Sequence, residues 1–312
     1  MKHNKADDVD GWLIIDKPCG MGSTQVVGKT RWLLHANKNG HTGTLDPFAT
    51  GVLPIAFGEA TKLVPFVMGG EKEYEFVVEW GAQTDTGDTE GKIIATSAKI
   101  PNREEIMAAL PHFIGKTRQI PPMYSAIKIN GQEAYKLARK GQTVEMPERE
   151  VEIYALELLE ERKKSAKFRV RCSKGTYVRT LGADIAEYLG SKGYLSELRR
   201  IKCGNFSISD TILLDSLEKM EYIDKRRESL LPIETSLRDI AEIAVSAQDA
   251  RKLSMGQGLS PKNYPEAKPT ELAAVKFHNC LIALVRVDER KISPIRVFHN
   301  IIKKEITDVD NK

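Results

Sequence analysis

Residues 40–51 have the sequence GHTGTLDPFATG, in which glycines, threonines and one histidine surround a single carboxylate, Asp46, that directly precedes a proline. Asp-Pro pairs commonly form turns, so an ordinary turn is one interpretation of this stretch. The apolar residues Leu45 and Phe48 flank the carboxylate, and residues 52–57 (VLPIAF) are expected to form a buried strand immediately afterwards. A carboxylate in such surroundings needs a cationic partner to stay ionised. The stretch alone therefore supports a functional site about as well as a turn.

The whole chain has the composition of a folded globular protein. Its 312 residues are 41% apolar and 29% charged, which is enough for one large domain and a smaller one without a disulfide or metal staple. The net charge of +4 arises from 47 basic and 43 acidic residues. That balance permits a polyanionic partner, but it falls short of the strongly basic character of a domain that coats DNA.

The cysteine spacing and the lengths of the apolar runs argue against a zinc or redox protein, a secreted protein and a membrane protein. No two of the four cysteines are spaced as a zinc or redox pair, and no secretion signal or apolar run of 18 residues is present. We therefore expect a cytoplasmic protein with no membrane span and no metal site. The cysteines are Cys19, Cys172, Cys203 and Cys280.

Apolar periodicity gives the expected order of elements. Strands are predicted at residues 12–15, 52–57, 74–80, 151–159 and 167–172, the last two as a hairpin, and helices at residues 24–34, 59–68, 103–113, 132–140 and 180–189. Prolines and glycines interrupt residues 119–149, so this stretch is predicted to leave the core as a long excursion. Residues 195–206 return to the core, and a boundary is expected near residues 232–240.

Two other stretches imitate known sites without matching them. Residues 22–30 (GSTQVVGKT) end in Gly-Lys-Thr as a phosphate-binding P-loop does, but five residues instead of four separate the two glycines. Apolar spacing also places this stretch inside a helix, so a nucleotide site at Lys29 is the less favoured interpretation. Asp85 and Asp88 lie among glycines but miss the EF-hand spacing, and a solvated turn is predicted there.

The stretch around Asp46 closely resembles the active-site motif of the TruB-type tRNA pseudouridine synthases, which act on uridine 55 in the T arm. Further segments resemble motifs of the same family in the same order, and together they are far more specific than any one alone. These segments are residues 16–21 (DKPCGM), 72–76 (KEYEF), 120–126 (IPPMYSA), 172–180 (CSKGTYVRT) and 198–200 (LRR). Towards the carboxy terminus the chain resembles a PUA domain, in its β-rich outline only.

The resemblance implies roles for four catalytic residues. Asp46 would be the nucleophile or the electrostatic stabiliser of a sugar cation, and Arg179 would pair with it and keep it ionised, preferably through a two-pronged contact. Tyr74 would stack on the extruded uracil, although a core aromatic on an alternating strand is the commoner fate of such a residue. Tyr177 is a candidate for proton transfer or gating.

Substrate contacts are expected at His41, which would pack against the RNA, and at Leu198, which would line the pocket. Lys17 is equally compatible with a structural role and with a phosphate contact. Basic residues on the excursion and on the 151–172 hairpin are expected to grip A-form RNA. They comprise Lys128, Lys136, Arg139, Lys140, Lys163, Lys164, Lys167, Arg169, Arg171 and Lys174, of which Lys128 and Lys174 are taken as substrate-binding candidates.

We therefore predict an α+β fold, with a catalytic domain over residues 1–237 that is built on a mixed, largely antiparallel sheet and carries a thumb insertion near residues 120–149. A small β-barrel-like, PUA-like RNA-binding domain is predicted over residues 238–302, followed by a flexible tail over residues 303–312. The expected activity is isomerisation of uridine 55 by base flipping, without metal or cofactor, in a monomer that binds the T arm and assists tRNA folding.

Two other classes of protein, and three chemical routes, stay open from the sequence. A non-catalytic RNA-binding or chaperone module would bind RNA without forming pseudouridine, and a P-loop NTPase would bind nucleotide. The routes are attack by Asp46 at C1′ of the ribose, addition at C6 of the base, and removal of a ribose proton through a glycal.

Overall fold

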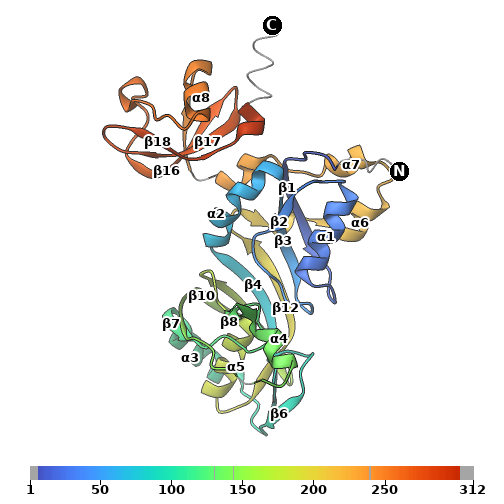
Figure 1. The fold of residues 1–312 in the computed structure, drawn as a ribbon. Helices are drawn as coiled ribbons and strands as arrows, with labels where there is room; N and C mark the ends of the chain where they lie inside the picture. Colours follow the sequence, from blue (N-terminus) through green and yellow to red (C-terminus); the bar gives the residue numbers. More distant parts are fainter. Residues whose placement is uncertain (1–5, 130, 143, 239, 303–312) are drawn as a thin grey trace.

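The computed structural model describes residues 6–129, 131–142, 144–238 and 240–302. Its largest feature is a ten-stranded mixed sheet that runs through the lower and middle parts of the molecule (Figure 1). Eight strands follow the order β14-β1-β3-β12-β4-β11-β10-β7. They are β1 (Gly11–Lys17), β3 (Thr50–Phe57), β4 (Lys72–Trp80), β7 (Gly115–Gln119), β10 (Arg149–Glu161), β11 (Ser165–Cys172), β12 (Gly193–Cys203) and β14 (Ile212–Leu213).

Most pairs in this sheet are antiparallel. Only β1–β14 and β12–β3 pair in parallel, whereas the short strands β2 (Asn39–His41) and β13 (Phe206–Ser207) pair antiparallel with β3 and β12. The prediction of a mixed, largely antiparallel sheet is confirmed, and so is the hairpin of β10 and β11.

Strand β4 has an apolar side, and acidic side chains project from its other side. Successive side chains of a strand point to opposite faces. Tyr74 and Phe76 therefore share a face, on which Phe76 stacks on Phe168 of β11 with ring centroids 5.3 Å apart. Glu73 and Glu75 project from the other face, which charged partners on β11 cover.

Helices pack on both faces of the sheet and connect the strands. The longest are α1 (Ser23–Leu33) and α5 (Val178–Tyr188), each of which buries an apolar stripe. The others are α2 (Val64–Gly69), α3 (Arg103–Ala109), α6 (Leu214–Lys219) and α7 (Ile223–Arg227), with 3-10 turns at Gly58–Leu63, Leu110–Phe113, Ile208–Asp210 and Ile233–Leu237. A small hairpin of β5 (Ala82–Thr84) and β6 (Ile93–Thr96) hangs from the lower end (Figure 1).

The predicted thumb is present between β7 and β10. It contains the two-residue strands β8 (Lys128–Ile129) and β9 (Gln132–Glu133), followed by helix α4 (Ala134–Arg139). Ala134 and Leu137 bury the inner side of this helix, while Lys128 stays exposed. The proline-rich start of the excursion lacks regular structure, as its composition predicts.

The carboxy-terminal unit differs from the prediction of a small barrel. Its four strands, β15 (Ala241–Ala244), β16 (Thr270–Phe277), β17 (Cys280–Val287) and β18 (Ile292–Val297), form one open sheet, and no closed barrel exists within residues 240–302. Strand β15 pairs with β16 in parallel. Strands β15 and β18 are the two edges of the sheet and do not pair with each other. Helix α8 (Ala247–Ser254) and a 3-10 turn at Pro261–Asn263 complete the unit. The predicted flexible tail, 303–312, lies outside the described residues.

An apolar interface fixes this unit against the catalytic sheet. Trp12 of β1 is fully buried in a cluster that also contains Leu284 and Phe298 from the carboxy-terminal unit. The indole of Trp12 donates to the Ile233 carbonyl at 2.9 Å, and Lys62 donates to the Val297 carbonyl at 2.7 Å. The unit is therefore attached to the strands that flank residues 40–51.

Candidate active site

The loop that carries Asp46 joins β2 to β3 and is fixed from below by α1 and the turn after β1. Ser23, the first residue of α1, accepts a hydrogen bond from the Leu45 amide at 2.8 Å and donates one to the Leu45 carbonyl at 2.9 Å. The Gly20 amide donates to the Pro47 carbonyl at 2.8 Å. The backbone groups of both neighbours of Asp46 are thus held by other segments, through the Ser23 hydroxyl and the Gly20 amide, which orders the carboxylate before any substrate arrives.

Lys17 lies beneath this loop and is fully buried. Its ammonium donates to the carbonyls of Pro18, Met21 and Pro47 at 2.9, 2.6 and 3.1 Å, which uses all three of its protons. Burial lowers the pKa of Lys17 to about 8, against the opposing effect of nearby acidic groups. Of the two roles left open for Lys17, the structural one fits these contacts.

Arg179, in the first turn of α5, pairs with Asp46. Its Nε lies 2.9 Å from Oδ2 of Asp46, and only 3% of the arginine side chain is exposed against 30% for the aspartate. The N–H is not aligned for a directed hydrogen bond, so charge holds the pair together. The predicted partner is present, but the two-pronged contact is not: the Nη atoms turn away towards the Thr86 and Tyr124 carbonyls, at 2.7 and 2.8 Å.

Asp88 is the second carboxylate on Arg179, and the prediction of a solvated turn at Asp88 is wrong. Its Oδ2 lies 3.3 Å from Nη1 of Arg179, and both side chains are 3% exposed. The Asp88 side chain also accepts from the Thr86 hydroxyl at 2.6 Å and the Glu90 amide at 3.0 Å. Asp85, in contrast, is exposed as predicted.

The contact between Asp88 and Arg179 could not be predicted from the residues around Asp88, because it joins segments 91 residues apart. Gly87, with φ +74°, lies so close to α5 that an added Cβ would be 3.3 Å from the Cβ of Arg179. A glycine beside an acidic residue is the only sequence trace of this packing, and it is indistinguishable from an ordinary turn.

Burial governs the charge state of Asp46. Loss of solvation raises the pKa of its carboxyl above the ordinary value of 3.8, and the neighbouring carboxylate of Asp88 raises it further. Arg179 and, more weakly, Lys17 oppose this rise without cancelling it. The pair therefore keeps a carboxylate in apolar surroundings, where it is poorly solvated and available to an electron-deficient carbon.

Tyr74 and Leu198 share a face of the sheet, because β4 and β12 pair in a register that places both side chains there. Leu198 is 7% exposed and belongs to the main core, and Tyr74 is partly buried against that core. Burial raises the pKa of Tyr74 to about 12, so its hydroxyl stays protonated. His41, at the end of β2, is half-buried and accepts from the Gly43 amide at 3.2 Å; burial lowers its pKa.

Tyr177 is the residue before α5 and is fixed at its backbone by Gln119. The amide of Tyr177 donates to Gln119 at 3.0 Å and its carbonyl accepts from the same side chain at 3.4 Å. The guanidinium of Arg149 lies 5.5 Å from the ring centroid. Burial raises the pKa of Tyr177, which makes this phenol a poorer proton acceptor than an exposed tyrosine.

The expected basic grip divides into two groups. Lys128 and Lys174 are exposed, as a phosphate contact requires. Strand β11 does not provide free cations, because its basic side chains pair across the outer face of the sheet with acidic residues of β4 and its amino-terminal flank. The pairs are Lys167–Glu75 at 2.7 Å, Arg169–Glu75 at 2.6 Å, Arg169–Glu73 at 3.7 Å and Arg171–Glu71 at 2.9 Å.

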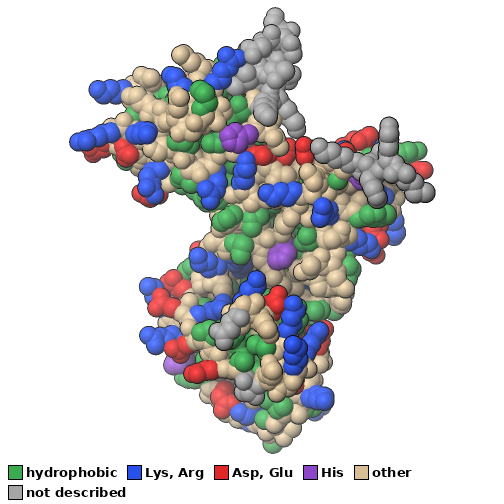
Figure 2. Space-filling view, viewed as in Figure 1, with side chains coloured by type: hydrophobic (Ala, Val, Ile, Leu, Met, Phe, Trp, Pro, Cys, Tyr) green, Lys and Arg blue, Asp and Glu red, His purple; other side chains and the backbone are tan. Residues whose placement is uncertain are grey.

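Because these three side chains are already paired, we expect Lys167, Arg169 and Arg171 to contribute less to RNA binding than Lys128 and Lys174, and their part in the grip stays a prediction. By strand alternation, Tyr74 points to the opposite face from Glu73 and Glu75. The ion pairs between β11 and β4 therefore lie on the face of the sheet away from Tyr74 and the apolar core that packs around Leu45 and Phe48. Figure 2 shows lysine and arginine side chains bordering the hollow between the carboxy-terminal unit and the catalytic sheet.

The remaining candidates bring no second site together. Helix α1 begins at Ser23, so Gly28 and Lys29 lie within it, and Lys29 pairs with Glu218 on the surface. The described residues contain no group of three or more acidic, histidine or cysteine side chains that could hold a metal ion. No helix in the described ranges is long and apolar enough to span a membrane.

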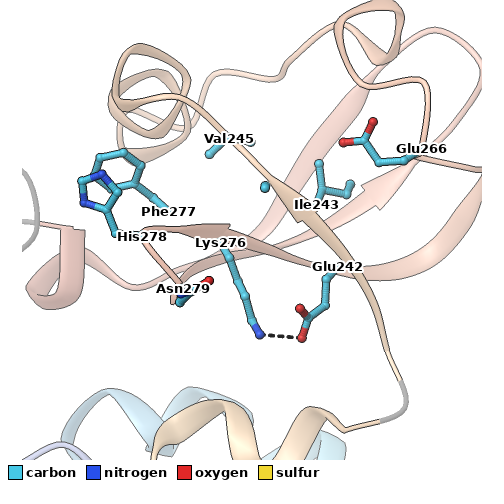
Figure 3. A pocket seen from close by; sticks show the side chains of 9 residues that line it. Glu242, Ile243, Val245, Glu266, Lys276, Phe277, His278 and Asn279 are labelled. Carbon is cyan, nitrogen blue, oxygen red and sulfur yellow. Dashed lines mark ion pairs between the residues drawn. The ribbon is translucent and has the colours of Figure 1, made fainter.

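A hollow of about 490 Å³ lies in the carboxy-terminal unit, between β15 and the β16–β17 turn (Figure 3). An ion pair between Lys276 and Glu242 spans 2.5 Å at its edge. None of the predicted site residues lines it.

The comparisons with known proteins agree along the length of the chain. The family model described as TruB family pseudouridylate synthase (N terminal domain) matches residues 31–178, and the model described as tRNA pseudouridylate synthase B C-terminal domain matches residues 179–238. The chain is similar to tRNA pseudouridine synthase B of Caulobacter vibrioides, with 43% identity over 305 residues, covering 95% of this chain and 98% of the relative. The corresponding protein of Bradyrhizobium diazoefficiens is 47% identical over 300 residues, covering 94% and 86%.

Solved structures with the same fold are more distant in sequence. One is a chain in the crystal structure of a Cbf5-Nop10-Gar1 complex, with a TM-score of 0.71 and 24% identity, covering 94% of this chain and 86% of that chain. Another is in the structure of an H/ACA RNP bound to a substrate RNA containing 2′-deoxyuridine, with a TM-score of 0.69 and 22% identity, covering 96% and 93%. At these identities the likeness establishes the fold alone.

Proposed function

This chain belongs to the TruB family of pseudouridylate synthases, and from that premise we propose that it isomerises uridine 55 in the T arm of tRNA. Relatives that are 42–47% identical over nearly the whole chain are tRNA pseudouridine synthases, and this chain is accordingly a tRNA pseudouridine synthase, an isomerase. The choice of position 55 is the proposed part, and it is supported by the family motif around Asp46.

The observation that carries the proposal is the Asp46 carboxylate, held 2.9 Å from a buried arginine at a half-open position on the protein surface. Isomerisation breaks the N1–C1′ bond, forms a C5–C1′ bond, removes the C5 proton and returns a proton to N1. Positive charge develops at C1′ when the first bond breaks. A carboxylate fixed there in advance stabilises that charge more than water does. Each of the three open routes uses this same carboxylate.

The neighbouring aromatic residues are suited to holding the detached base. Tyr74 offers a rigid ring on the face shared with Leu198, and stacking of a base on an aromatic ring contributes about 1–3 kcal/mol. Tyr177, two residues before Arg179, is the candidate for gating or proton transfer, and its raised pKa favours gating. His41, on the strand leading into the loop, contacts the flipped nucleotide in this proposal.

The RNA is gripped by the thumb and by the carboxy-terminal unit. Lys128 on the thumb and Lys174 beside Tyr177 are exposed and free to meet phosphates. We assign residues 1–237 to catalysis and residues 238–302 to RNA binding, since the latter have a core of their own. The enzyme works in the cytoplasm as a monomer without an obligatory protein partner, and uses neither a metal nor a cofactor.

Release of tritium from tRNA that carries [5-³H]uridine tests the proposal, because only attack at C5 frees that label. Wild-type protein should release one equivalent per tRNA and per isolated T-arm stem-loop, and none from a transcript with cytidine at position 55. Release from the cytidine variant would contradict the assigned position. Tight binding without any release would favour the RNA-chaperone alternative.

A further inference from the structure

Arg200 is a buried cation that the reaction has not yet used. Its side chain is 1% exposed, which makes it one of the largest fully buried side chains in the described part of the protein. No described carboxylate forms an ion pair with it, and the groups that act on its charge are the Tyr74 phenol and the Cys203 thiol. A charge buried without a counter-charge is costly, so its contacts need an explanation other than stability.

The hydrogen bonds of Arg200 join the segments on both sides of the site. Nε donates to the Val52 carbonyl at 2.7 Å, directly after the loop, and Nη2 donates to the Gly43 carbonyl at 3.1 Å, three residues before Asp46. Tyr74 lies directly opposite Arg200 in the β12–β4 pair, and its phenol is one of the groups that act on the charge of the guanidinium. One planar group therefore connects the ring on β4 with the loop that carries the nucleophile.

The backbone is shaped to allow this approach. Arg200 lies opposite Tyr74 on one side of β12 and opposite Gly51 on the other. Gly51 has φ +99°, and a Cβ there would lie 2.2 Å from the Arg200 carbonyl oxygen. Gly43 has φ +148°, and a Cβ there would lie 3.6 Å from Nη1. Gly51 therefore makes room for the Arg200 backbone, whereas a Cβ at Gly43 would be at ordinary contact distance from the guanidinium.

We propose that Arg200 is a positioning residue, whose guanidinium fixes the Tyr74 ring relative to the Gly43–Asp46 loop and so sets the spacing between detached base and carboxylate. This inference rests on the proposed function, in which Tyr74 holds the base and Asp46 acts at the sugar. A planar guanidinium suits the task because two of its nitrogens donate to backbone carbonyls in fixed directions while the residue lies opposite Tyr74, an arrangement that a lysine ammonium cannot reproduce.

A double-mutant cycle tests the proposal, with single-turnover tritium release and the RNA dissociation constant measured for wild type, Arg200→Lys, Tyr74→Phe and the double variant. Arg200→Lys should lower the rate on the order of 10²-fold, the effect of a misplaced reacting group, and leave the dissociation constant within about twofold. Tyr74→Phe keeps the ring but should also lose rate. The double variant should be no slower than the slower single variant, because both remove one contact.

Arg226→Lys is the matched control. Arg226 is half-buried and donates to two backbone carbonyls, those of Leu33 and Glu218, away from the site. Its substitution should change the rate by no more than about twofold. A wild-type rate in Arg200→Lys, or losses that multiply in the double variant, would overturn the proposal. Failure of the proposed function itself is distinct, since wild-type protein would then release no tritium.

A second measurement keeps the proposal falsifiable if Arg200→Lys does not fold. In ¹⁵N-arginine-labelled protein, the guanidinium signals of Arg200 should show hindered rotation in wild type and faster rotation in Tyr74→Phe, which retains the native arginine. Unchanged guanidinium signals together with an unchanged tritium-release rate in Tyr74→Phe would refute the positioning role.

Discussion

Replacement of Asp88 by asparagine removes one charge from the buried group of Asp46, Arg179 and Asp88 while keeping the shape of the side chain. Breaking a buried ion pair by removing one partner costs about 3–5 kcal/mol. Arg179 keeps Asp46 and two carbonyl acceptors, so a loss of about 1.5–3 kcal/mol, that of one hydrogen bond to a charged group, is the better value. In a protein of this size that loss lowers Tm by roughly 3–12 °C.

The same substitution should impair the reaction more than the binding of RNA. Asp88 is buried and touches no solvent-facing surface that RNA could reach. It holds Nη1 of Arg179, and through Arg179 the direction of the Asp46 pair. A shift on the order of 1 Å in such a group lowers the rate on the order of 10²-fold. We expect a single-turnover rate reduced by about 10- to 100-fold with an RNA dissociation constant close to that of wild type.

Tritium release under single-turnover conditions and thermal unfolding of the same samples measure both effects. Asp85→Asn is the matched control, because Asp85 lies in the same loop but is exposed and accepts only from the Lys92 amide in the described structure. The reasoning is refuted if Asp88→Asn has the rate and the Tm of its Asp85→Asn control.

Three further predictions follow from burial and charge. Because burial raises the pKa of Asp46, activity should fall as the pH drops through a value above the ordinary 3.8, and a pH–rate profile without such a loss would contradict this. Above its raised pKa the ionised carboxylate lowers the stability of the fold, so Asp46→Asn should not lower Tm at neutral pH. Gly51→Ala, with a Cβ 2.2 Å from the Arg200 carbonyl and φ +99°, should cost more than about 2 kcal/mol in a urea titration, and an unchanged midpoint would argue against the close packing. Arg169→Ala should leave RNA affinity within about twofold, whereas Lys128→Ala should weaken binding and reduce its salt dependence by about one phosphate contact; equal effects in filter binding would contradict the assignment of the two faces.

The parts of the fold that the sequence predicted are those set by local patterns. Alternation in residues 72–80 and the apolar run in residues 52–57 mark two strands that bury one or both faces, and these strands are present as β4 and β3. Prolines in the 119–149 stretch remove amide donors and prevent regular structure, so an excursion was predictable there. The ion pair of Asp46 with Arg179 came from family motifs 133 residues apart, and no local pattern contains it.

The features that the sequence did not predict depend on pairing between distant segments. Arg169 and Arg171 look like free cations until the β11–β4 pairing places Glu75 and Glu73 opposite them, with Glu71 just before β4 pairing with Arg171. Asp88 resembles a turn residue until α5 places Arg179 against it. The closed barrel was expected from strand composition alone, but closure depends on whether the edge strands meet, which composition does not encode. The sequence could not distinguish a structural role from a phosphate contact for Lys17, because its three acceptors are backbone carbonyls, which have no signature in sequence.

The essential carboxylate is tested most directly by mapping pseudouridine in an unmodified tRNA transcript after a single turnover with wild type and with Asp46→Asn. We expect one pseudouridine, at position 55, with wild-type protein, and none with Asp46→Asn at equal RNA occupancy, because the amide cannot stabilise charge at C1′. Pseudouridine formed by Asp46→Asn at a rate near that of wild type would show that the chemistry belongs to another group.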